Sequence, residues 1–138
     1  RPARLAGQAE VGVHGPPPPA DADPRASAVL DHACLSEMHA SDGARAELVH
    51  RTEHSALMMA AAIDHLVEGP PSTHVLSESF PDLGRVTITV TLEPGERLRL
   101  IKFVTYGWSA ERSAEALRDQ VDAALVAARR AGWDVLVA

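Results

Sequence analysis

The residues of this sequence best suited to chemistry are histidines and carboxylates in its middle third. His50, Glu53 and His54 satisfy the pattern H-x-x-E-H. On a helix, this spacing presents two zinc ligands on one face, with the glutamate as general base. However, Leu48 and Val49 favour a strand, in which residues four apart are separated by about 13 Å. We therefore expect no zinc site here.

Two other groups could in principle take part in catalysis. Cys34 is close in sequence to His32 and His39, but a nucleophile needs a base close in space, which sequence does not reveal. A buried or incidental thiol is the simpler interpretation. Asp64 and His65 could form an acid–base pair, yet neighbours in a strand point to opposite faces, so a strand end is the simpler interpretation there. We assign no catalytic, cofactor-binding or metal-binding residue.

Three further side chains could bind a ligand. Lys102 interrupts an apolar segment and could hold an anion, although a salt bridge or an apolar stem reaching toward solvent is the more ordinary role. Trp108 and Trp133 flank a predicted helix. Aromatic rings of this kind stack on sugars, but at helix ends they more often anchor packing.

The segment that must position these side chains runs from Arg97 to Trp133. The pattern predicts a strand up to Tyr106, a break at Gly107, and then a long amphipathic helix. Ser109 is the expected N-cap and Gly132 the expected residue after the helix. The apolar stripe of this helix comprises Ala114, Leu117, Val121, Ala124, Leu125 and Ala128. Such a helix needs a sheet or another domain to cover this stripe.

The remaining elements are mostly strands. Apolar residues alternate with threonines from Val86 to Leu92, and the loop 93–96 has the size of a hairpin, so we expect the Arg97 strand to return antiparallel to it. Residues 44–54 are also predicted to form a strand, while 56–66 fit a helix or a buried strand. In the returning strand Leu98, Leu100 and Val104 share one face. The opposite face carries Ile101 and Phe103, which predicts burial on both sides.

The first third of the chain is less regular. Residues 1–13 could hold one short strand, and 14–25 form a proline-rich loop that includes four consecutive prolines from Pro16 to Pro19. Those prolines could dock in an SH3-type groove, but the absence of flanking basic residues favours a simple loop insertion. Residues 27–40 show no clear period.

Composition limits the possible classes of function. The chain has 138 residues, of which 46% are hydrophobic, and a net charge of −6, which argues against a nucleic-acid surface. Its longest apolar run, Ala56 to Ile63, is far shorter than the ~20 residues of a membrane span. A single cysteine and the lack of a visible signal peptide fit a reducing, cytoplasmic location. The start at Arg1 and the apolar end at Val135–Ala138 suggest a piece of a larger protein.

Several motifs, in order, resemble the N-terminal domain of glycoside hydrolase family 65. They are Asp42 to Leu57, Asp64-His65, Pro94 to Lys102, Tyr106 to Ser109, Arg112-Ser113, Leu117 to Val121 and Gly132 to Asp134. The likeness covers most of Asp42–Ala138. Before that it rests mainly on Asp23 to Arg25, and the prolines at 16–19 depart from the pattern.

This resemblance implies a mainly β fold with one long C-terminal helix. It implies a partial antiparallel sandwich of the galactose-mutarotase-like type over residues 1–108, and a linker helix over 109–138 that leads to an (α/α)6 catalytic barrel outside this sequence. No position matches the family's catalytic or phosphate-binding residues.

The same resemblance implies a function for the parent protein. The family includes maltose, trehalose and kojibiose phosphorylases and related hydrolases, which act on α-linked glucosides. It implies no metal or organic cofactor, inorganic phosphate as co-substrate in a phosphorylase, and a possible homodimer, with no nucleic-acid or membrane partner. The alternative from another class is a standalone carbohydrate-binding or interaction module without catalysis.

Overall fold

The computed structural model describes residues 3–12 and 34–138, with side chains described from residue 34 onward. The described residues form strands β1 (Ala3–Gly12), β2 (Cys34–Asp42), β3 (Arg45–Thr52), β4 (Met58–Glu68), β5 (His74–Phe80), β6 (Leu83–Leu92) and β7 (Arg99–Ser109), followed by helices α1 (Ala114–Ala131) and α2 (Trp133–Leu136). The fold is mainly β with helices at the C-terminal end, as the sequence predicts.

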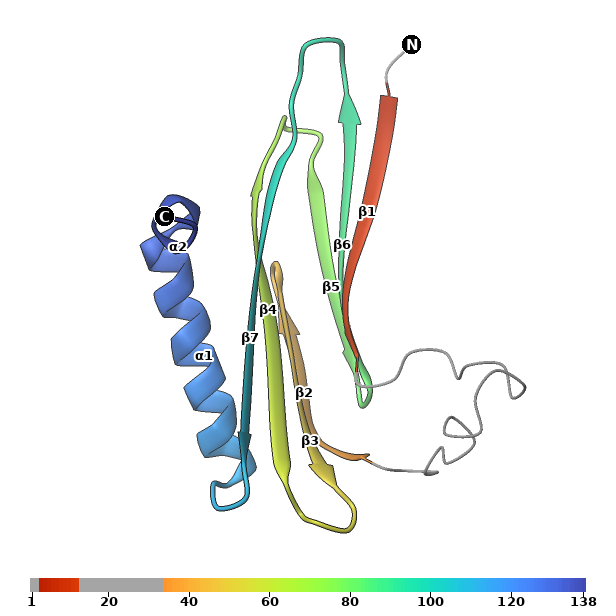
Figure 1. Ribbon diagram of the computed structural model, residues 1–138. Coiled ribbons are helices and arrows are strands. Elements are labelled where there is room, and N and C mark those ends of the chain that lie inside the picture. The colour runs from red at the N-terminus through yellow and green to blue at the C-terminus, as the bar shows by residue number, and fades with distance from the viewer. Residues whose placement is uncertain (1–2, 13–33) are drawn as a thin grey trace, which may run out of the picture.

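The strands form two antiparallel sheets that pack face to face. One sheet has the order β2-β3-β4-β7 and the other the order β1-β6-β5. Figure 1 shows α1 on the outer side of the four-stranded sheet and the three-stranded sheet on its inner side. The described part of the chain is thus a sandwich with a helix along one face.

The alternating segment predicted as a strand is the centre of the smaller sheet. In β6, Val86, Ile88 and Val90 are buried and the threonines between them are half-buried. β6 pairs with β1 on one side and β5 on the other. A strand at 1–13 and a strand at 44–54 are confirmed as β1 and β3, and the ambiguous segment 56–66 is strand β4.

The predicted hairpin between β6 and the Arg97 strand is wrong. β7 pairs antiparallel with β4, with Ile63 opposite Val104, and not with β6. Both edges of β6 are already occupied by β1 and β5, so no position beside it is left for a returning strand. The loop after Leu92 therefore carries the chain from one sheet to the other.

The C-terminal helix begins later than predicted. Its N-cap is Ser113, whose side-chain oxygen accepts from the Ala116 amide at 3.3 Å. Ser109 instead accepts from the amides of Glu111 and Arg112 in the preceding turn. At the other end Gly132 (φ 78°) closes α1 as expected, but the short helix α2 follows, so this region holds two helices rather than one.

The hydrophobic core is divided between the two faces of the four-stranded sheet. The outer core lies beneath α1 and is centred on Leu117, Val121 and Leu125. Burying each of these side chains contributes about 1.5–3 kcal/mol. The inner core lies between the sheets and comprises Ala46, Leu48, Ile63, Val86 and Ile88.

Strand β7 is buried on one face only, contrary to the prediction. Ile101 and Phe103 are buried beneath α1. On the inner face, Leu100 and Val104 are 46% and 42% exposed. The three-stranded sheet is one strand narrower than its partner, so it leaves this edge uncovered. The proline-rich loop 14–25 lies outside the described residues, and of 27–40 only β2 is described.

Candidate functional site

The H-x-x-E-H residues do not come together. His50 lies in β3 and is 1% exposed, whereas Glu53 and His54 lie in the turn that follows and are exposed. Across the part of the chain that the structure describes, no three histidine, cysteine or carboxylate groups are placed to hold a metal ion. The strand interpretation of this motif is confirmed for His50, which lies in β3, whereas Glu53 and His54 lie just beyond the end of that strand.

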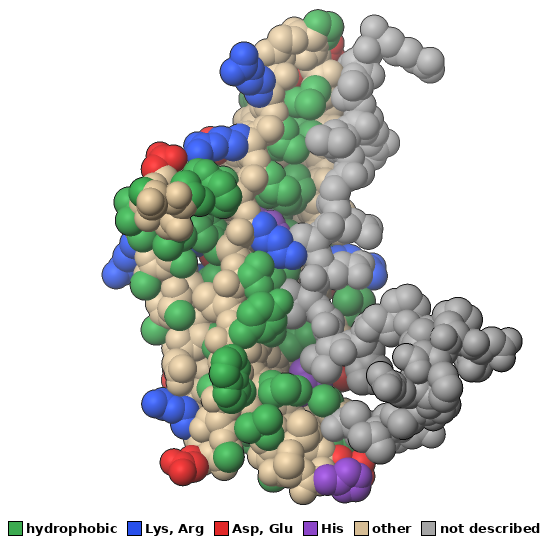
Figure 2. Space-filling model, viewed as in Figure 1, with side chains coloured by type: hydrophobic (Ala, Val, Ile, Leu, Met, Phe, Trp, Pro, Cys, Tyr) green, Lys and Arg blue, Asp and Glu red, His purple; other side chains and the backbone are tan. Residues whose placement is uncertain are grey.

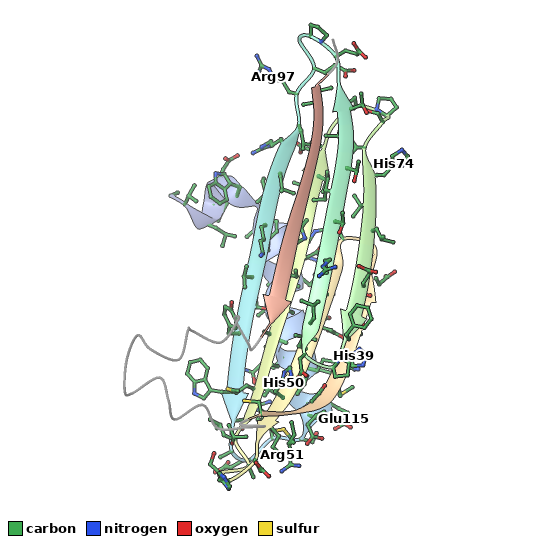
Figure 3. The ribbon with its side chains drawn as sticks, turned by 90° about the vertical axis from the view of Figure 1, so that its right-hand side faces the viewer. His39, His50, Arg51, His74, Arg97 and Glu115 are labelled. Carbon is green, nitrogen blue, oxygen red and sulfur yellow. The ribbon has the colours of Figure 1, made fainter. Side chains whose placement is uncertain are left out.

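His50 instead links the two sheets. Its Nε2 atom lies 3.0 Å from Oδ1 of Asp82, which belongs to the turn between β5 and β6. The imidazole is buried and the carboxylate is largely exposed, so the pair joins the interior of β3 to the rim of the opposite sheet. Figure 3 shows His50 in the lower half of the sandwich, behind the three-stranded sheet.

Asp64 and His65 point to opposite faces of β4, as their positions in a strand require. They lie inside this strand and are 1% and 2% exposed, so the interpretation as a strand end was wrong. His65 Nδ1 donates to the Ala44 carbonyl at 2.9 Å, which makes Nε2 the acceptor of the neutral ring. Nε2 is buried and has no hydrogen-bond partner among the described residues. The two side chains therefore do not form an acid–base pair.

Asp64 is the centre of a charged network at the joint between α1 and the sheet. Its Oδ2 atom accepts from Arg129 Nη1 at 2.8 Å and from Arg45 Nη2 at 3.2 Å. Arg45 also pairs through Nη1 with Asp122 of α1. The Asp64 side chain is 2% exposed, so two arginines satisfy a carboxylate that has little access to water. Residues far apart in the sequence thus fix the helix to strands β3 and β4.

A further carboxylate lies at the margin of this network. Burial raises the pKa of Glu47 in β3, while the nearby Arg118 acts in the opposite direction. Asp122 adds to the rise. A carboxyl with a raised pKa is a candidate general acid, but Glu47 lies beside α1 and the charged network, and no hydrogen bond joins it to another side chain of the described residues.

The apolar side of the same joint depends on Gly107. A Cβ atom at this position in β7 would lie 2.9 Å from Val121 Cγ1 and 3.2 Å from Leu117 Cδ1. Next to it, the Thr105 hydroxyl donates to the Val121 carbonyl at 3.1 Å. The glycine therefore allows the helix to approach the strand closely, whereas the sequence had suggested a break in the strand.

The inner face of β7 presents a row of exposed apolar side chains. Leu100, Val104, Tyr106 and Trp108 alternate along this face, and the two aromatic residues are 71% and 72% exposed. In Figure 2, hydrophobic side chains gather in a band along the edge where β7 lies. We call these four residues the β7 row. Lys102 lies among them and is also exposed.

The other predicted candidates are dispersed. Cys34 is half-buried at the start of β2, and His39 contacts the Ser79 hydroxyl at 3.1 Å, while His32 lies outside the described residues. Trp133 is 48% exposed in α2, whose Val135 and Leu136 are also exposed. Neither of the described helices is long and apolar enough to cross a membrane.

The described residues thus form a two-sheet β-sandwich segment with a helix fixed to the outer face of its four-stranded sheet. The sequence matches the family described as glycosyl hydrolase family 65, N-terminal domain, over residues 4–138. This chain belongs to that family.

Curated relatives agree with this assignment. Two proteins named as uncharacterized glycosyl hydrolases, from Mycobacterium tuberculosis strains CDC 1551 and H37Rv, are each 43% identical over 134 residues. A protein of the same description from Mycobacterium leprae is 42% identical. The match covers 97% of this chain but only 17% of each relative. The chain therefore spans about a sixth of the length of these proteins.

Sequence reasoning missed the residues that join the helix to the sheet. Arg45, Asp64 and Arg129 are 19 and 65 positions apart. An aspartate inside the apolar segment 58–67 was a detectable signal, because a carboxylate there must find a cation. Which cation it finds depends on the pairing of β3 with β4 and on where α1 docks.

Proposed function

We propose that this chain is a non-catalytic part of the N-terminal domain of a longer family 65 enzyme that acts on α-glucosides such as maltose or trehalose. Residues 1–108 belong to a larger sandwich of the galactose-mutarotase-like type, and 109–138 connect it to a catalytic (α/α)6 barrel. Support comes from the family match over residues 4–138 and from the small share of each relative that the chain covers.

The observation that best supports the non-catalytic role is the burial and hydrogen bonding of the Asp64 side chain. It is the most buried carboxylate of the described residues, and both of its oxygens are engaged, Oδ2 by Arg45 and Arg129 and Oδ1 by the His65 amide at 2.7 Å. A carboxylate that is buried and engaged at both oxygens has no oxygen free to contact a substrate. Its role is to hold α1 at a fixed angle on the sheet.

In the longer protein, the resemblance implies inverting attack at the anomeric carbon, by phosphate in a phosphorylase or by water in a hydrolase. A glutamate of the barrel serves as general acid, and inorganic phosphate is the co-substrate of the phosphorylase reaction. We place the enzyme in the cytoplasm, as a homodimer, without a metal or organic cofactor. The sandwich contributes by supporting the barrel.

The proposal is tested by assaying the longer protein with maltose, trehalose and kojibiose, with and without phosphate. We expect release of glucose, accompanied by glucose 1-phosphate if phosphate is the nucleophile. Variants His50→Gln, Asp82→Asn and Cys34→Ala are then compared at a temperature at which each is folded. We expect kcat to stay within about threefold of the parent, because none of these groups touches substrate.

A general acid or base contributes roughly 10²–10⁴-fold to the rate. A loss of that size in one of these variants, with an unchanged melting temperature, would place chemistry in this segment. Failure of the longer protein to cleave any α-glucoside would instead reject the substrate class and leave the family assignment unchanged.

One observation favours a second candidate, a carbohydrate-binding module. Tyr106 and Trp108 share a face of β7 and are both largely exposed, as in aromatic platforms that stack on sugar rings. Titration of the longer protein with a maltooligosaccharide, monitored by calorimetry, distinguishes the two. If the carbohydrate-binding candidate is correct, Trp108→Ala abolishes binding of the maltooligosaccharide but leaves turnover of maltose unchanged.

A further inference from the structure

No further inference is drawn: the strongest candidate, the apolar surface patch on α2 where Trp133, Val135 and Leu136 are exposed, carries none because nothing in the structure of the described residues shows what covers it.

Discussion

Asp64 of β4 and Arg129 of α1 are 65 residues apart in the sequence, but Oδ2 of the aspartate lies 2.8 Å from Nη1 of the arginine. This ion pair, together with the contact between Asp64 and Arg45, fixes the position of α1 along the sheet. An apolar stripe alone would allow the helix to slide or rotate, because hydrophobic contacts are not directional. The ion pairs select one position.

Asp64→Asn should therefore weaken the joint. The variant leaves two arginines without their anionic partner while keeping the shape of the side chain, and we expect a loss of about 1–3 kcal/mol in the free energy of unfolding. Urea denaturation followed by circular dichroism measures it. The control is Asp119→Asn, which removes an exposed pair with Arg118 and should change little. Equal losses in the two variants would show that the buried network contributes no more to the free energy of unfolding than the exposed pair does.

Gly107→Ala should separate α1 from β7. The added methyl group would lie 2.9 Å from Val121 Cγ1, and the stiff valine side chain has little room to move. We expect a loss of about 1–3 kcal/mol from overpacking, measured by thermal or urea unfolding. The double variant Gly107→Ala/Val121→Ala removes the clash and should recover part of the loss. If the second substitution adds its full cost instead, the two residues do not meet as described.

Ser113→Ala should destabilise the start of α1. The variant leaves the Ala116 amide without its side-chain acceptor, and loss of an N-cap typically costs about 0.5–2 kcal/mol. The backbone amide of Glu115 and, to a smaller extent, the Ser113 side chain lower the pKa of Glu115, so the variant should also raise that pKa part of the way toward its ordinary value. Carbon-detected NMR titration of the Glu115 carboxyl reports this change.

The comparison for this experiment is Ser109→Ala. Ser109 accepts hydrogen bonds in the turn but caps no helix. The Ser109→Ala variant should therefore leave the titration of Glu115 unchanged. A shift in the Ser109 variant but not in the Ser113 variant would support the N-cap expected from the sequence over the one in the structure.

Glu47→Gln should stabilise the fold near neutral pH. Burial raises the pKa of Glu47, so the folded state disfavours its charged form, and ionisation reduces stability as the pH rises through the folded pKa. The neutral amide avoids this loss. The advantage should be largest above the raised pKa and disappear below the unfolded value of about 4.3. This pH dependence is tested by measuring the melting temperatures of parent and variant from about pH 3.5 to about pH 8. A constant difference across that interval would exclude ionisation of Glu47 as the cause.

The sequence by itself determined the local elements. Alternation at Val86, Ile88 and Val90 requires a strand with one buried face, and the three- and four-residue spacing of Leu117, Val121 and Leu125 requires an amphipathic helix. These patterns depend only on the repeat of the backbone. The family could also be recognised from the sequence alone, because a series of motifs in a fixed order can be compared without knowing which residues are in contact.

Only the tertiary structure decided which elements are neighbours. The short loop after Leu92 favoured a hairpin, yet β7 pairs with β4, because both edges of β6 are already occupied. One edge pairs with β5, which directly precedes β6 in the sequence, and the other pairs with the distant β1. The exposure of Tyr106 and Trp108 follows from the narrower opposing sheet, which no local pattern encodes. The partners of Asp64 likewise depend on long-range register. Periodicity shows which face of an element is apolar, but the element that covers that face is set by the packing of the whole sandwich.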